Sequence, residues 1–333
     1  MSKFRSAQVV GVLAVAGAIA LSMTAGASAH PVSSSSAAKP TVVLVHGAWA
    51  DGSSWAAVTA QLQHDGYTVD VVPNPLRGLQ ADADYLNNYL ATISGPIVLV
   101  GHSYGGMVIT AAATGNANVQ ALVYVDAFIP DTGDSTSSLA GAEPGSALAA
   151  DPTTIFNFVG DPADPQNPDL YVKPSLFPSF FAGGVPARQA QVLAAEQRPI
   201  KADAVGESLT GTPAWKTIPS WALIGTADRV IPVAEQHAMA ARAGSHVVTV
   251  DAPHLSMLTD PTAVTNLIER PPILTDEVAC AGGLCRRHTN QPAWLAGRRP
   301  TPRTRQWCPP QASGDGTSPD ARPSGSTNER TTP

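Results

Sequence analysis

The sequence predicts an α/β fold, in which a mostly parallel β-sheet is covered by helices on both faces. Short runs of β-branched and apolar residues, typical of buried parallel strands, alternate with segments whose apolar residues recur at helical spacing. Turn residues separate the two kinds of segment over most of the 333-residue chain. Repeated strand–helix units of this kind pack as a parallel sheet between helices.

The composition is typical of a globular enzyme. Apolar residues make up 44% of the chain and charged residues 14%. These values exclude a disordered acidic protein and a nucleic-acid-binding protein with basic stripes. The sequence leaves the oligomeric state open.

The N-terminal segment, residues 1–29, has the pattern of a signal peptide. Lys3 and Arg5 precede an apolar run over residues 9–23, and the small residues Ala27-Ser28-Ala29 form the expected cleavage site. The apolar run is shorter than the roughly 20 residues needed to span a bilayer. We therefore expect a secreted protein without a membrane anchor, in which residues 30–40 form a linker.

The first strand is predicted at residues 41–46, followed by a turn at Gly47 and a helix that Ser53 caps and Gly66 ends. Further strands are predicted at residues 68–72, 97–100, 121–125, 220–224 and 246–250. Further helices are predicted at residues 81–93, from 104 onward, and at 233–243 and 261–269.

The strand–helix alternation fails between about residues 130 and 213. This stretch is rich in Pro and Gly, contains clusters of aromatic residues, and shows one helical run near residues 186–197. It is too apolar to be a linker, so we expect a lid that folds over the sheet and shapes a pocket. The lid and the sheet together form one domain, residues 41–269.

Residues 270–333 differ from the rest of the chain. They are rich in Arg and Pro, contain no Lys, and show no periodicity of helix or strand. A disordered tail is expected, either as a genuine extension or as a frame-shift or read-through product. All three cysteines lie here, and a disulfide between Cys280 and Cys285 is one alternative to incidental cysteines.

The strongest motif is Gly101-His102-Ser103-Tyr104-Gly105, a Gly-x-Ser-x-Gly pentapeptide between a predicted strand and a predicted helix. Such a sharp strand-to-helix turn exposes the serine hydroxyl, and the glycines allow the close backbone approach that it requires. Ser103 is therefore the candidate nucleophile, against the alternative of a plain glycine-rich turn.

A serine hydroxyl requires a base, and the base requires a group that orients it. His254 follows the strand at 246–250, at the sheet edge where α/β proteins bind their ligands, and is the candidate base. Asp228 follows the strand at 220–224 and is the preferred acid. Asp126, which ends the strand at 121–125, is its competitor; otherwise it lines the pocket or holds the neighbouring loop.

An oxyanion hole requires backbone N–H groups directed at the developing negative charge. The candidates are Tyr104, directly after the serine, and Ala48, with Trp49 as the alternative to Ala48. Two further histidines flank these positions, and a structural role is expected for both: His46 and His102.

These segments resemble the α/β-hydrolase superfamily. The resemblance rests on His46-Gly47-Ala48-Trp49, the elbow at residues 101–106, the segment 225–232 and Pro253-His254, and covers residues 41–269. Within the superfamily, the chain is similar to small-molecule esterases, plant methyl esterases and hydroxynitrile lyases. The resemblance implies an eight-stranded sheet and cofactor-free hydrolysis of a carboxylic ester. Hydroxynitrile lyases of this group carry lysine after the histidine, whereas Leu255 stands here.

The sequence predicts a serine hydrolase that cleaves the ester, lactone or amide of a small apolar substrate through an acyl-enzyme. Trp49 and aromatic residues of the lid favour an apolar substrate group, although lid packing also explains them: Phe156, Phe158, Tyr171, Phe177, Phe180 and Phe181. The alternatives are a cofactor-free perhydrolase or haloperoxidase-like enzyme, and a non-catalytic ligand-binding protein. No metal-binding spacing is present within residues 30–269.

Overall fold

The computed structural model describes residues 39–271, 278–281 and 284–287. The predicted signal peptide, most of the linker and most of the tail lie outside these ranges. Within them, no helix is long and apolar enough to cross a membrane.

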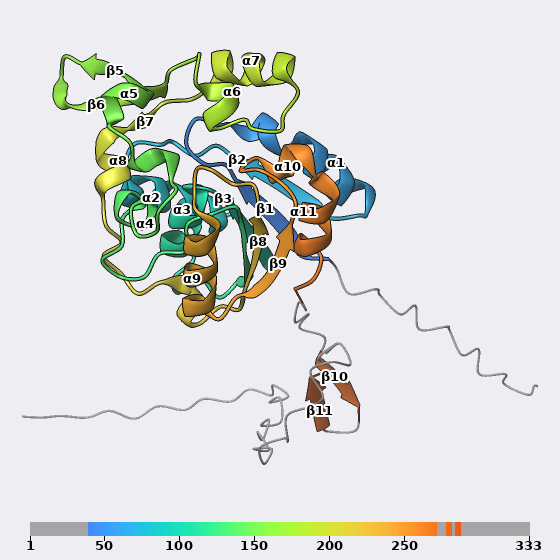
Figure 1. Cartoon of the computed structure of the whole chain (residues 1–333). Helices are drawn as coiled ribbons and strands as arrows, with labels where there is room; N and C mark the ends of the chain where they lie inside the picture. The colour runs from blue at the N-terminus through green and yellow to red at the C-terminus, as the bar shows by residue number, and fades with distance from the viewer. Residues whose placement is uncertain (1–38, 272–277, 282–283, 288–333) are drawn as a thin grey trace, which may run out of the picture. The chain divides into compact units, whose positions relative to one another are not determined.

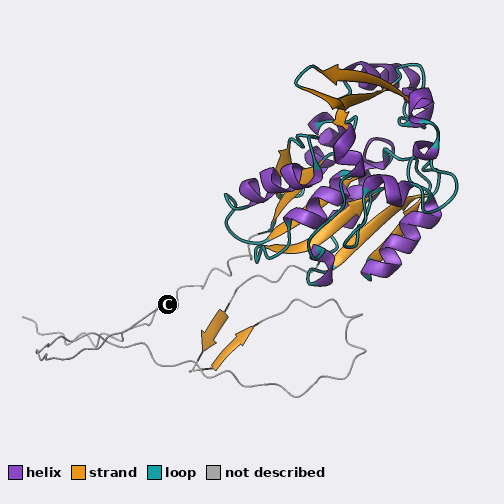
Figure 2. Cartoon of the chain, turned by 90° about the vertical axis from the view of Figure 1, so that its left-hand side faces the viewer, coloured by secondary structure: helices purple, strands orange, loops and turns teal. Residues whose placement is uncertain are grey.

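The centre of the fold is a parallel sheet of six strands in the order β2-β1-β3-β4-β8-β9, which confirms the predicted fold class (Figure 2). β1 pairs in parallel with both β2 and β3, and the remaining neighbours are also parallel. The strands are β1 (Thr41–Val45), β2 (Thr68–Val72), β3 (Ile97–His102), β4 (Val119–Val125), β8 (Ser220–Gly225) and β9 (His246–Val250).

Among the described residues the central sheet has six strands, two fewer than the eight that the resemblance implies. No described strand precedes β1, and the chain between β4 and β8 forms the lid instead of adding strands to the sheet. The central strands β3 and β8 are completely buried, and β4 is buried except at Gln120, because helices cover both of their faces. This burial explains their mostly apolar and β-branched sequences.

Helices lie on both faces of the sheet (Figures 1 and 2). The order of the strands reverses at β1, so right-handed crossovers place α1 on one face and α2, α3 and α9 on the other. α11 packs against α1. The bounds are η1 (Gly52–Trp55), α1 (Ala56–His64), α2 (Leu79–Leu90), α3 (Gly105–Ala112), α9 (Val233–Ala243), α10 (Ser256–Thr259) and α11 (Pro261–Ile268).

The first helical segment begins earlier than the sequence predicts. Asp51, rather than Ser53, is the capping residue, and its carboxylate accepts a hydrogen bond from the Ser53 N–H at 2.8 Å. Asp and Ser are both strong N-cap residues, so residue preference alone does not separate them. A short 3₁₀ turn then leads into α1.

The segment between β4 and η3 (Ala214–Lys216) contains the lid, most of which lies above the sheet in Figure 1. It contains a small antiparallel sheet in the order β5-β6-β7, which the sequence did not predict, and a helix at the predicted place, α7. The elements are α4 (Thr136–Ala140), η2 (Ala147–Ala149), α5 (Pro152–Ile155), β5 (Phe156–Asp161), β6 (Asp164–Val172), α6 (Phe177–Phe180), α7 (Ala187–Glu196), β7 (Ile200–Lys201) and α8 (Ala202–Gly206).

Two short strands, β10 (Val278–Ala281) and β11 (Leu284–Arg287), pair as an antiparallel hairpin within the predicted tail. Their register places Cys280 opposite Cys285. A disulfide between them and incidental cysteines stay the two alternatives that the sequence offers.

Candidate active site

Ser103 lies on a sharp turn between β3 and α3, with a positive φ of 51°. Such a conformation is strained for a residue with a Cβ atom, and it persists where the surroundings fix it. The glycines of the turn leave no room for a side chain: a Cβ atom on Gly101 would lie 2.6 Å from the carbonyl oxygen of Gly105, and one on Gly106 2.2 Å from that of Phe128. The Gly-x-Ser-x-Gly-Gly sequence therefore gives the backbone space to present the hydroxyl.

The structure brings Ser103, His254 and Asp228 together. His254, on the loop after β9, has its Nε2 3.0 Å from the Ser103 Oγ and its Nδ1 2.8 Å from the Asp228 Oδ2. A carboxylate only accepts hydrogen bonds, so the imidazole Nδ1–H donates to Asp228 and Nε2 is left to accept from the serine hydroxyl. All three side chains are buried.

Asp228 is held in place by three donors. Its Oδ1 accepts from the N–H groups of Val230 at 2.7 Å and Ile231 at 3.0 Å, and its Oδ2 accepts from the Gln236 side-chain amide at 2.8 Å. The same amide donates to the Ile231 carbonyl. The carboxylate therefore has one orientation, with Oδ2 toward the imidazole.

The described hydrogen bonds of the Asp126 carboxylate go to backbone N–H groups and not to the imidazole, and Asp126 lies outside the cavity lining described below. Its Oδ1 accepts from the Gly225 N–H at 2.7 Å and its Oδ2 from the Ser256 N–H at 3.3 Å. Complete burial, and then the nearby Asp228, raise the pKa of Asp126 well above its usual value. This side chain joins the loop after β8 to the start of α10, next to His254.

Two buried histidines support the turns around the serine. His102 donates from Nε2 to the His254 carbonyl at 3.0 Å, and burial together with the neighbouring His254 lowers the pKa of His102 well below its usual value. His46 donates from Nδ1 to the Gly47 carbonyl and accepts at Nε2 from the Asn74 N–H. Burial lowers the pKa of His46 to about 4. Both rings are therefore neutral near pH 7.

Two backbone N–H groups beside Ser103 are available as donors. Within the described part of the chain, the N–H groups of Ala48 and Tyr104 have no hydrogen-bond partner. The N–H of Trp49, by contrast, donates to the Arg198 carbonyl at 3.1 Å, which removes it as the alternative to Ala48. Gly47 allows the turn to approach the serine, because a Cβ there would lie 2.7 Å from the Ser103 Cβ.

A cavity of about 350 Å³ opens between Ser103 and the lid. Ala48 and Tyr104 line it beside the serine, and none of its lining residues is charged. Apolar side chains form most of its wall, including Trp49, Phe128, Leu148, Phe156, Leu170 and Ile200. Of the other aromatic residues predicted for the pocket, Phe158 lines this cavity, whereas Phe177 and Phe181 line a much smaller one and Tyr171 and Phe180 line neither.

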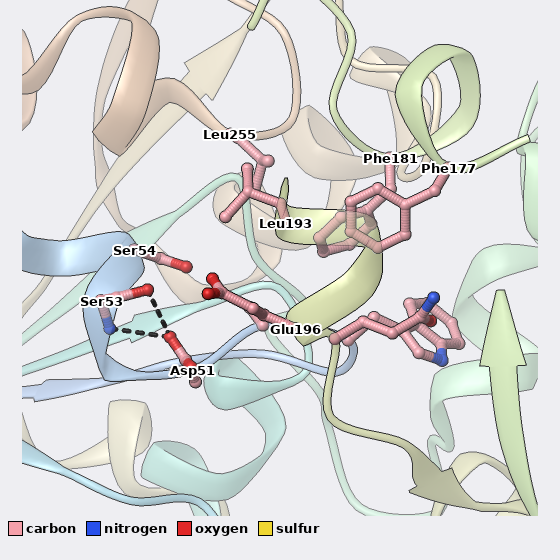
Figure 3. A pocket seen from close by; sticks show the side chains of 11 residues that line it. Asp51, Ser53, Ser54, Phe177, Phe181, Leu193, Glu196 and Leu255 are labelled. Carbon is pink, nitrogen blue, oxygen red and sulfur yellow. Dashed lines mark hydrogen bonds between the residues drawn. The ribbon is translucent and has the colours of Figure 1, made fainter. Parts of the chain in front are cut away.

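The smaller pocket lies where the lid meets η1 (Figure 3). Phe181 and Leu193 of the lid lie across from Ser53 and Ser54, and Asp51 accepts hydrogen bonds from Ser53. Its volume of about 10 Å³ is that of one water molecule, so it is too small for a substrate. Among the residues that the structure describes, no three His, Cys, Asp or Glu side chains gather as a metal site.

The sequence did not reveal two residues that orient the machinery. Gln236 is on α9, where helical periodicity marks it only as one polar residue among others. Asn74 follows β2; its N–H donates to His46 and its side-chain amide to the His46 carbonyl. Its position after a parallel strand, at the same edge of the sheet as the other site loops, is the signal that could have indicated it.

Residues 42–267 match the alpha/beta hydrolase family. The chain belongs to this family. Among solved structures, this hydrolase resembles a mutant of polyneuridine aldehyde esterase, with a TM-score of 0.59 and 20% identity over 69% of this chain and 97% of the other.

Two relatives by sequence are enzymes of the group that the sequence resembles. The hydrolase is 37% identical over 110 residues to the carbendazim hydrolyzing esterase of Nocardioides sp. (strain SG-4G), which is 29% of this chain and 46% of the relative. It is 30% identical over 104 residues to the alpha-hydroxynitrile lyase of Arabidopsis thaliana, which is 27% of this chain and 40% of the relative. The matches thus span less than half of either relative, and they confirm the resemblance to this group.

Proposed function

We propose that this chain is a serine hydrolase that cleaves a carboxylic ester, or a lactone or amide, of a small apolar compound through an acyl-enzyme intermediate. The observation that carries the proposal is the hydrogen-bonded series Asp228–His254–Ser103 beside an apolar cavity. The esterase among the relatives supports the same reaction class.

In the acylation step, the Ser103 Oγ attacks the carbonyl carbon of the substrate while His254 Nε2 takes the hydroxyl proton. Asp228 accepts from Nδ1–H and stabilises the imidazolium that forms. The carbonyl oxygen gains negative charge, and the N–H groups of Ala48 and Tyr104 donate to it. The bond to the leaving alcohol then breaks, and His254 returns the proton to that alcohol.

Deacylation repeats these steps with water as the nucleophile. His254 takes a proton from water, the resulting hydroxide attacks the acyl carbon, and the bond to Ser103 breaks as Oγ regains a proton. The products are a carboxylic acid and the free enzyme. The low pKa of His102 keeps a second positive charge away from the imidazolium, whose ring centre lies 4.8 Å from that of His102.

The cavity favours an uncharged substrate. A charged group entering it would lose its water without gaining a charged partner, since no lining residue carries a charge. Apolar and aromatic groups gain from burial against Trp49 and Phe156. We therefore expect aryl and alkyl esters to be preferred over esters that carry a carboxylate or an ammonium group.

Leu255 favours hydrolysis over lyase chemistry. This residue directly follows His254 and is buried. Hydroxynitrile lyases of the group that the sequence resembles have a lysine at this position. An aliphatic side chain cannot supply the positive charge of that lysine.

Labelling with a fluorophosphonate tests the nucleophile. We expect one label per chain, on the peptide that contains Ser103, and a parallel loss of activity toward p-nitrophenyl esters. Ser103→Ala should neither label nor turn over, while its circular dichroism spectrum remains that of the parent chain. Labelling of the Ser103→Ala variant at the parent rate would overturn the assignment.

We also propose that the protein is exported after removal of residues 1–29. The charged start, the apolar run and the small-residue site of these residues support this proposal. The mass of the protein secreted by an expressing cell should correspond to a chain that begins at His30. Retention of the intact N-terminus in the cytoplasm contradicts it.

A further inference from the structure

The turn after β1 is attached to the lid by its residue Trp49. The Trp49 N–H donates to the Arg198 carbonyl at 3.1 Å, and its indole Nε1–H donates to the Leu170 carbonyl of β6 at 2.9 Å. The indole also stacks on Phe156 with ring centres 5.2 Å apart, and meets Phe180 and Phe181 edge to face. The side chain is 4% exposed. Both the backbone and the side chain of this residue therefore depend on the lid.

The backbone at Trp49 is strained. Its φ of 56° lies in the left-handed region, which residues other than glycine, asparagine and aspartate seldom adopt. Leu76, in the loop after β2, is in the same region at 61°, and its carbonyl accepts from the Lys201 N–H at 3.0 Å. One lid segment, residues 198–201, thus bonds to both strained loops. Strain of this kind persists where surrounding contacts fix it.

Trp49 directly follows Ala48, the proposed oxyanion donor. The peptide unit between Ala48 and Trp49 carries the Ala48 carbonyl and the Trp49 N–H, and Arg198 holds this unit through the N–H. Relaxation of φ at Trp49 would turn this unit, and the preceding unit, which is joined to it at the Ala48 Cα and carries the Ala48 N–H, would turn with it. We propose that Trp49 is a positioning residue through which the lid sets the direction of the Ala48 N–H. The lid then contributes to stabilising the transition state as well as to enclosing the substrate. This inference rests on the proposed function, because it requires an oxyanion at that place.

Trp49→Phe is the variant that tests the proposal. It keeps an aromatic ring against Phe156 but removes the indole N–H that donates to Leu170. Trp215→Phe is a matched control, since the Trp215 Nε1–H donates to the Pro130 carbonyl at 2.7 Å and this residue lies outside the cavity lining. Each substitution removes one indole–carbonyl hydrogen bond, and only the first touches the turn after β1.

Two ketones of the same skeleton separate positioning from binding. A trifluoromethyl ketone reacts with Ser103: the Oγ bonds to the carbonyl carbon, the hydroxyl proton passes to His254, and the carbonyl oxygen becomes an oxyanion. The corresponding methyl ketone binds without that bond and reports contacts in the cavity alone. The ratio of their inhibition constants therefore measures the oxyanion interaction.

For Trp49→Phe we expect kcat to fall about 10-fold or more and the preference for the trifluoromethyl ketone to fall by a similar factor, because losing one oxyanion donor outright costs about 10² to 10³. KM and the methyl ketone affinity should change less than about 3-fold, since cavity contacts are retained. Trp215→Phe should retain the parent ketone preference.

A Trp49→Phe variant that keeps the parent preference for the trifluoromethyl ketone overturns the inference. An equal loss of affinity for both ketones also overturns it, because Trp49 would then act only as part of the cavity wall. Failure of the proposed function looks different. In that case the parent chain itself shows no preference for the trifluoromethyl ketone and no covalent adduct at Ser103.

Discussion

Asp228→Asn provides a sharp test of how His254 is oriented. In the structure, Asp228 Oδ1 accepts from two backbone N–H groups, those of Val230 and Ile231. An asparagine can satisfy both only with its amide oxygen at that place, so its NH₂ must take the place of Oδ2. It then faces the imidazole Nδ1, 2.8 Å from Oδ2 in the parent chain. A donor there requires Nδ1 to accept, which moves the ring proton to Nε2.

With its proton on Nε2, the imidazole cannot accept the proton of Ser103, although the three side chains stay in place. The wrong tautomer in serine proteases lowers kcat by about 10⁴, which corresponds to about 5.5 kcal/mol of the activation barrier. The new NH₂ also faces the amide of Gln236, which donates to Oδ2 in the parent chain. We therefore expect kcat to fall by about 10³ to 10⁴ with little change in KM.

Steady-state hydrolysis of a p-nitrophenyl ester measures this loss, and Asp126→Asn is the matched control. That substitution keeps one acceptor for Gly225 or Ser256 and leaves the imidazole contacts intact, so kcat should fall less than about 10-fold. A larger loss for Asp126→Asn than for Asp228→Asn would transfer the orienting role to Asp126. Near-parental turnover of Asp228→Asn would refute the tautomer argument itself.

Three further outcomes follow from the geometry. Gly47→Ala should abolish ester hydrolysis in a folded protein, because its Cβ would lie 2.7 Å from the Ser103 Cβ and 2.9 Å from the His102 carbonyl oxygen; normal turnover would show that the turn can shift. Burial lowers the pKa of His46 to about 4 in the folded chain, against 6.5 in the unfolded chain. As the pH falls below 6.5, the unfolded chain therefore binds more protons than the folded one. Between pH 7 and pH 5, His46 should account for a loss of about 2 kcal/mol in the free energy of unfolding. Urea unfolding of His46→Gln at pH 7 and at pH 5 should show a loss of unfolding free energy that is smaller by this amount than in the parent chain. An equal loss in the two proteins would contradict the burial argument. A chain that ends at Arg270 should keep the melting temperature and the activity of the longer chain, because the family match ends at residue 267; a large drop in either would show that the tail docks on the domain.

The site loops were readable from the sequence because their positions depend on strands alone. Ser103 and Asp228 follow β3 and β8, whose residues are all buried, and His254 follows β9, an edge strand of mostly β-branched residues that are exposed or half-buried. The carboxyl ends of parallel strands share one edge of the sheet, so these residues had to approach one another. The sequence favoured Asp228 over Asp126 because the order Ser, Asp, His along the chain is typical of this fold. The hydrogen bond between Asp228 and His254 Nδ1 depends on side-chain positions, which only the structure gives.

The lid was not readable, because its structure depends on contacts distant in sequence. β5 and β6 contain Pro and Asp, which are unfavourable in strands, although the two pair with each other as a local hairpin. The bonds that attach the lid to Trp49 and to the loop after β2 join residues far apart in the chain. The indole bond of Trp49 joins residues 121 positions apart, and no periodicity reports it. For the same reason the sequence marked Trp49 as a pocket residue but did not reveal its attachment to the lid.

The central claim, that Ser103 carries the acyl group during turnover, is tested most directly by intact-protein mass spectrometry of the chain mixed rapidly with a p-nitrophenyl ester. We expect a transient mass increase equal to one acyl group, located on the peptide that contains Ser103, formed with the p-nitrophenol burst and lost at the steady-state rate. The Ser103→Ala variant should show neither the burst nor the adduct. Turnover at the parent rate in that variant, or an adduct on another residue that forms and decays at the catalytic rate, would contradict the account.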